Sequence, residues 1–110
     1  MKVLFYKVGE EPKLVEILGT DDSMRQLVGG ELEGFELPEL PNILKGKYYL
    51  VMDTDGMEKN KPTNRGEFAG DMFVLAIDEE NQRYRSLLED EVSHITFAMD
   101  ILMPAAPSSN

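Results

Sequence analysis

Short apolar runs along the chain predict a β-sheet. Four of these runs are rich in branched and aromatic side chains: residues 1–6, 14–18, 48–52 and 72–77. Each is too short for one face of a helix and suits a mostly buried strand. Glycine and proline between the first two runs predict a turn, so residues 1–18 are expected to form a β-hairpin. Residues 32–37 suggest a further extended segment, and Tyr84, with Ser86 and Leu87, is expected to return as the last strand.

Two other stretches have the periodicity of helices. In the first, Thr20 can cap the opening turn, and Met24 and Val28 fall on one face. Gly29 can adopt the left-handed conformation that ends a helix at little steric cost. A short helix is therefore expected between residues 20 and 29.

The second helix is expected near the C-terminus. Its apolar residues recur at spacings of four and three, as in a helix lying on a core: Leu88, Val92, Ile95, Met99 and Leu102. Phe97 and Ile101 lie roughly half a turn away from this stripe. Two interpretations stay open for this pair: a broad buried face or cover by the tail, and a surface for a partner protein or a homodimer.

These elements together predict an α+β fold. We expect a mixed or antiparallel sheet of about five strands, with one short helix and a C-terminal helix packed on a sheet face. A closed or half-closed barrel is the alternative topology. Residues 1–103 are expected to form a single domain and 104–110 a flexible tail, with 38–47 as an irregular crossing.

Composition and charge narrow the class of protein. The chain has 110 residues, no cysteine, and 21 acidic against 11 basic residues, a formal net charge of −10. This charge disfavours direct binding of nucleic acid or of anionic membranes. Without a long apolar run or a signal-peptide pattern at the start, the protein is expected in the cytoplasm.

The acidity has two interpretations. One is solubility. The other is that an acidic face imitates the phosphate backbone and occupies a basic groove on a nucleic-acid-handling protein. Glu31, Glu33 and Glu36, together with Phe97 and Ile101, are the candidate contacts for such a partner.

Basic residues gather in one part of the chain. Residues 45–65 hold five basic side chains against three acidic ones. The segment after residue 56 is polar and contains Pro62, which predicts a surface loop. Within it, the candidate contacts for a nucleotide or another small anion are Lys59, Lys61, Asn64 and Arg65. The preceding turn departs from a calcium loop, because its glycine comes fourth and Asn64 stands at the twelfth position.

No catalytic residues are assigned from the sequence. His94 is the only histidine, and its neighbour Ser93 points to a different helical face. Acidic residues near His94 are more simply explained as helix-end charges than as metal ligands. We therefore expect neither a metal nor a cofactor, and an enzyme is the less favoured class.

The order of motifs resembles a known family. Its centre is a strand that ends in an acidic turn with glycine, followed by a short basic linker and then Pro62, Asn64 and Arg65. Matching features on either side are the opening strand 1–6, the residues 27–30 that close the short helix, and 69–71 leading into 73–76. The chain resembles the uncharacterised family of domain of unknown function 3846. The resemblance implies an origin in phages or mobile elements, and it implies no catalytic residues.

Two functions are expected from these observations. The first is a non-enzymatic acidic protein of a phage or mobile element that binds a host protein and inhibits a defence or nucleic-acid-handling enzyme. The alternative is a module that binds a small ligand, a nucleotide or an anion, through residues 59–65.

Overall fold

Eight strands and two helices make up the described part of the chain. The structure, a computed structural model, describes residues 1–38, 46–56, 59 and 61–104. In chain order the elements are β1 (Lys2–Tyr6), β2 (Lys13–Glu16), α1 (Asp21–Val28), β3 (Leu32–Glu36), β4 (Lys47–Asp53), β5 (Thr63–Arg65), β6 (Phe68–Ala69), β7 (Met72–Asp78), β8 (Arg83–Arg85) and α2 (Glu89–Leu102). The predicted irregular segment 38–47 and the predicted tail 104–110 lie mostly outside these residues.

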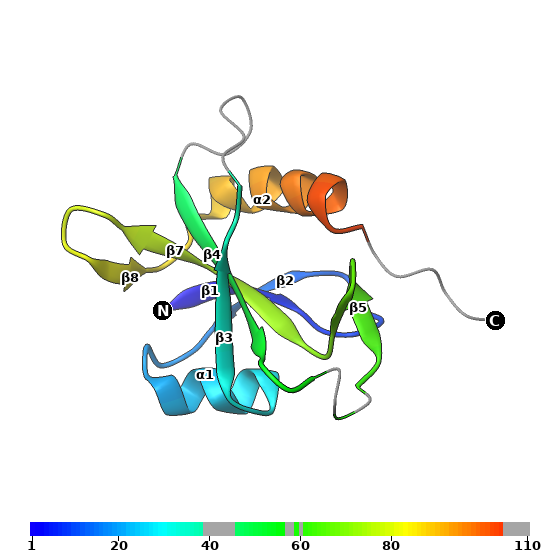
Figure 1. Ribbon diagram of the computed structural model, residues 1–110. Helices are drawn as coiled ribbons and strands as arrows, with labels where there is room; N and C mark the ends of the chain where they lie inside the picture. The colour runs from blue at the N-terminus through cyan, green and yellow to red at the C-terminus, as the bar shows by residue number, and fades with distance from the viewer. Residues whose placement is uncertain (39–45, 57–58, 60, 105–110) are drawn as a thin grey trace.

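Six of the strands form one antiparallel sheet (Figure 1). Its order is β2-β1-β7-β4-β3, and β8 pairs with the C-terminal part of β7. The two most apolar runs of the sequence, β4 and β7, lie at the centre, where Leu50 and Val74 are opposite each other and fully buried. The sheet ends in β2 on one side and β3 on the other, so the described strands do not close into a barrel. The predicted α+β fold is confirmed, and the barrel alternative is wrong.

The two helices cover opposite faces of the sheet (Figure 1). Because side chains alternate along a strand, β4 and β7 contribute to both faces. Leu50 and Val74 pack in the cluster that contains Ile95 and Met99 of α2. The other cluster joins Val51 of β4 and Phe73 of β7, which point to the opposite face, to Met24 and Val28 of α1. Neither described helix is long and apolar enough to span a membrane.

The helix ends agree with the sequence at α1 and differ at α2. Thr20 accepts a hydrogen bond from the Ser23 amide at 3.2 Å, and Gly29 takes a φ of 75° just after α1 ends. Leu88, counted in the buried stripe of the C-terminal helix, is instead the residue before α2 and is 59% exposed. The last predicted strand also ends sooner than expected, because β8 stops at Arg85.

A second, two-stranded sheet lies where a loop was predicted. β5 pairs with β6 in antiparallel orientation, and Gly66 makes the turn between them with a φ of 56°. The prediction that the whole of 57–65 is a surface loop is therefore wrong for its last three residues. Apolar periodicity does not predict β5, because its sequence is polar. Its second and third residues are buried through side-chain hydrogen bonds rather than through apolar packing.

Candidate interaction surfaces

The two lysines of the basic segment meet at a buried carboxylate. Asp53 ends β4, and its side chain accepts hydrogen bonds from Lys59 Nζ at 2.8 Å and from Lys61 Nζ at 2.6 Å. The Asp55 amide adds a third hydrogen bond at 3.0 Å. Burial opposes the charge of Asp53, but the hydrogen bonds from the lysines and the amide outweigh it and hold the pKa of this carboxyl below its ordinary value. These groups form an internal ionic cluster.

The same cluster closes the C-terminal end of α1. Lys61 Nζ also donates to the backbone oxygens of Val28 at 3.0 Å and Gly29 at 3.2 Å. A cation at this end of a helix satisfies carbonyl groups that have no partner within the helix. Gly30 packs directly on the carboxylate, since a Cβ at this position would lie 2.3 Å from Asp53 Cγ. Lys61 therefore joins α1 to β4.

The other two ligand candidates lie in a different place. Asn64 is buried, and its Nδ2 donates to the backbone oxygens of Tyr6 at 2.8 Å and Gly70 at 2.9 Å. Arg65 Nη1 lies 2.7 Å from Asp100 Oδ1 on α2, and its guanidinium stands 5.0 Å from the centre of the Tyr6 ring. Burial raises the pKa of Tyr6 above its ordinary value, and the nearby Arg65 partly offsets this. The structure thus gives all four candidates internal partners, in two separate groups.

A third polar cluster attaches the start of α2 to the sheet. Arg85 donates from Nη1 and Nη2 to the two carboxylate oxygens of Glu91, each at 2.8 Å, and the Tyr48 hydroxyl donates to the same carboxylate. Burial raises the pKa of Glu91, yet these hydrogen bonds lower it further, to about 2. Burial and the hydrogen bond to Glu91 raise the pKa of Tyr48 to about 12. Sequence analysis missed this cluster, because Tyr48 is 43 residues from Glu91 and Arg85 meets Glu91 only where β8 lies next to α2.

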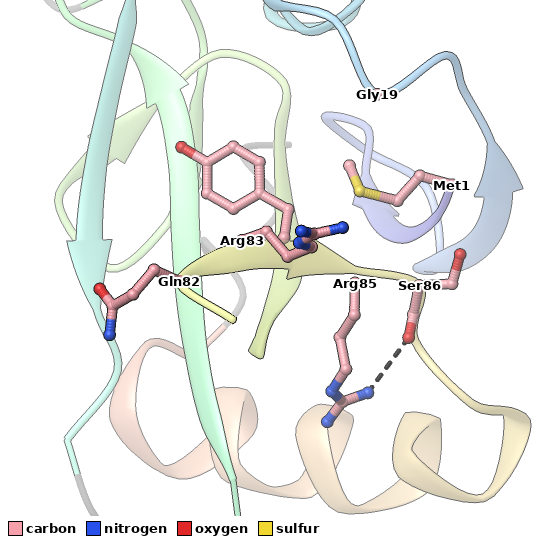
Figure 2. A pocket seen from close by; sticks show the side chains of 7 residues that line it. Met1, Gly19, Gln82, Arg83, Arg85 and Ser86 are labelled. Carbon is pink, nitrogen blue, oxygen red and sulfur yellow. Dashed lines mark hydrogen bonds between the residues drawn. The ribbon is translucent and has the colours of Figure 1, made fainter. Parts of the chain in front are cut away.

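An open cavity lies beside β8. Its volume is about 630 Å³, and its lining comprises Met1, Gly19, Gln82, Arg83, Tyr84, Arg85 and Ser86. The volume is within the range of small-molecule sites. Figure 2 shows the side chain of Arg85 turned toward α2, away from Met1 and Gly19. The bidentate bond to Glu91 accounts for this orientation, so Arg85 contributes little charge to the cavity.

The pair of apolar residues on the C-terminal helix is exposed. Phe97 is 57% exposed and Ile101 is 56% exposed, whereas Ile95, Ala98 and Met99 are fully buried against the sheet. The interpretation of a broad buried face is therefore wrong for this pair, and the interpretation of cover by the tail concerns residues outside the described part of the chain. Asp90 and His94 precede Phe97 at helical spacing and are exposed as well. All four side chains lie on the outward side of α2.

The family model for the domain of unknown function (DUF3846) matches residues 1–99. The match covers nearly all of the chain. The chain belongs to this family. No curated protein and no solved structure is similar enough to this DUF3846 chain to be matched.

Of the three candidate glutamates of the DUF3846 chain, Glu33 and Glu36 lie in its edge strand β3, and Glu31 directly precedes this strand. Each has one partner: Glu31 lies 3.3 Å from Arg25, Glu33 accepts from Thr54 Oγ1 at 3.0 Å, and Glu36 lies 3.6 Å from Lys47. Because neighbouring strand residues point to opposite faces, Glu33 and Glu36 extend to different sides of the sheet. They flank an edge and do not form one acidic face.

Proposed function

We propose that the protein works by binding another protein through the outward side of α2. The observation that carries this proposal is the exposure of Phe97 and Ile101, which stand four residues apart on a helix whose opposite side is buried. Neighbours at this spacing form one continuous apolar patch. We call the four residues Asp90, His94, Phe97 and Ile101 the α2 surface.

The size of the patch indicates how much binding free energy it can contribute. Full burial of a large apolar side chain contributes roughly 1.5–3 kcal/mol. Phe97 and Ile101 each expose a little more than half of their surface. Covering both would therefore contribute about 2–3 kcal/mol, which is roughly a 30- to 150-fold gain in affinity. The patch can act as the centre of an interface but needs further contacts around it.

Charge defines the partner. Exposed carboxylates accompany the patch at Glu89, Asp90 and Asp100 of the same helix, and the formal net charge of the chain is −10. A partner with a basic rim around an apolar pocket would match this arrangement, associate quickly and release at high salt. Proteins that handle nucleic acids carry lysine and arginine side chains where they hold phosphates. We propose that the chain is a non-enzymatic, cytoplasmic protein of a phage or mobile element that inhibits an enzyme of this kind.

The test is affinity capture with matched variants. The tagged wild type, the double variant Phe97→Ser/Ile101→Ser, and the control Leu18→Ser are incubated with host lysate and washed at rising salt. Leu18 is a suitable control because it is 73% exposed and lies outside α2. The proposal expects one nucleic-acid-handling protein that wild type and control retain, that salt releases steeply, and that the double variant fails to capture. Equal capture by all three proteins contradicts it.

The alternative is a small-anion site at Lys59, Lys61, Asn64 and Arg65. It is less well supported, because a ligand would have to replace the internal partners of all four side chains. A thermal-shift series with nucleotides and inorganic phosphate checks it. A rise in unfolding temperature at millimolar ligand, absent in Lys59→Ala, would favour the alternative over the α2 surface.

A further inference from the structure

The outer edge of β3 has backbone groups that face away from the sheet. β3 is the last strand in the sheet order, and in the described residues it pairs only with β4. The Thr54 amide donates to the Glu31 oxygen, and the Leu37 amide donates to the Tyr48 oxygen. In an antiparallel pair such bonds recur at every second residue. The N–H and C=O groups of Leu32, Gly34 and Glu36 therefore face outward, as in a strand with room for another neighbour.

Gly34 at the centre of this edge is not required by the fold. Its φ is not positive, and a Cβ there would meet Val51 Cγ2 at 3.8 Å, an ordinary contact distance. Glycine weakens a strand by roughly 0.5–1 kcal/mol relative to alanine. In strands it often marks a place where another backbone or a ligand comes close. Gly34 leaves the middle of the outward-facing groups uncovered by a side chain, and an alanine Cβ there would point to a sheet face without blocking the edge.

The charges beside the edge select the kind of strand that can pair there. Glu31, Glu33 and Glu36 flank the outward groups, and pairing of two copies through β3 would bring six glutamates together. Like charges on paired strands are destabilising, whereas opposite charges stabilise the pair. The other edge strand, β2, begins with Lys13 and ends with Glu16, so it has no such preference. The charge pattern disfavours a second copy and favours a basic strand.

We propose that β3 accepts an extended basic segment of a partner protein as an additional strand of the sheet. The segment bonds to the outward N–H and C=O groups of Leu32, Gly34 and Glu36, and its lysine or arginine side chains lie beside the glutamates. Such strand addition takes its affinity from main-chain hydrogen bonds and its selectivity from the side chains. The β3 edge is separate from the α2 surface. Substitutions in the α2 surface are expected to leave binding at the β3 edge unchanged.

Three synthetic peptides test the proposal. The first alternates lysine with valine over ten residues, the second replaces each lysine with glutamate, and the third keeps the lysines but replaces two central valines with proline. Binding is measured by fluorescence anisotropy, and amide hydrogen exchange is followed by NMR. We expect the first peptide to bind and to slow exchange at Leu32, Gly34 and Glu36 at least tenfold, and the other two to bind at least tenfold more weakly.

Other outcomes overturn the proposal. Equal binding of the proline peptide would mean that charge alone attracts the peptide. Absence of binding at millimolar peptide, or protection confined to other amides, would mean that β3 is not the site. Protection of the same three amides by raising the protein concentration without peptide would identify a second copy as the occupant.

Two variants test the site itself. Gly34→Pro removes an outward N–H and leaves the ladder to β4 intact, and Gly34→Ala is its matched control. We expect the proline variant to lose at least tenfold in affinity for the lysine peptide and the alanine variant to keep most of it. If Gly34→Pro does not fold, the triple variant Glu31→Lys/Glu33→Lys/Glu36→Lys provides the test in its place. It should prefer the glutamate peptide, and an unchanged preference for lysine would overturn the proposal.

Discussion

Substitution of Asp53 by asparagine should destabilise the protein by about 3 kcal/mol. The side chain of Asp53 is fully buried, whereas Lys59 and Lys61 keep 44% and 23% of their side-chain exposure. A hydrogen bond between charged groups contributes roughly 1.5–3 kcal/mol, and partial exposure of the lysines places each bond at the lower end. Two such bonds give about 3 kcal/mol. For a domain of this size the unfolding temperature should fall by about 12–18 °C.

The assay is urea unfolding followed by circular dichroism. Asp55→Asn is the matched control, because it changes the same charge in the same turn while its backbone amide still bonds to Asp53. The control should stay within about 0.5 kcal/mol of the wild type. A loss of less than 1 kcal/mol in Asp53→Asn, or an equal loss in the control, would refute the argument that this carboxylate holds α1 and β4 together.

The same substitution should remove part of the pH dependence of stability. The pKa of Asp53 in the folded protein lies below its unfolded value of roughly 3.9. Its stabilisation is therefore fully present above about pH 5 and is lost as the pH falls below about 4. The difference in unfolding free energy between wild type and Asp53→Asn should shrink over that range. A difference in unfolding free energy that stays constant down to pH 2 would contradict the lowered pKa of Asp53.

Two further substitutions test the packing around the helices. Glu91→Gln should cost about 2 kcal/mol at pH 7, because it weakens the bidentate bond from Arg85. With a folded pKa of about 2 for Glu91, this cost should fade as the pH drops from about 4.5 toward 2, measured by the same unfolding assay. Gly30→Ala should cost about 1–3 kcal/mol, since its Cβ would collide with Asp53. Gly19→Ala, which has nothing within 4 Å of its added Cβ, is the control and should unfold at nearly the wild-type temperature.

The elements that bury apolar side chains could be predicted from the sequence. Periodicity located the two central strands and the C-terminal helix, because burial imposes a repeat of two or 3.6 residues on apolar positions. The ends of α1 could also be predicted, because Thr20 and Gly29 cap the helix through hydrogen bonds to residues three or four positions away. Phe97 and Ile101 were singled out for the same reason, because they depart from the buried stripe of α2.

The polar clusters could not be predicted in this way. Asn64 is buried because its side-chain amide donates to the backbone oxygens of Tyr6 and Gly70. The pattern of apolar residues in the sequence does not predict such hydrogen bonds. The pairing of Arg85 with Glu91 likewise depends on how β8 meets α2. Glu31, Glu33 and Glu36 appear as one acidic group in the sequence, yet strand alternation places Glu33 and Glu36 on opposite faces of the sheet. Charge counts describe a segment, and only the fold decides which charges meet.

The most direct test of the proposed function is the affinity of the captured partner for two forms of the protein. The dissociation constant would be measured by titration calorimetry for the wild type and for Phe97→Ser/Ile101→Ser, at low and at high salt. Our account predicts a roughly 30- to 150-fold weaker complex for the double variant and weaker binding of both forms at high salt. Equal dissociation constants for the two forms would contradict the claim that the α2 surface holds the partner.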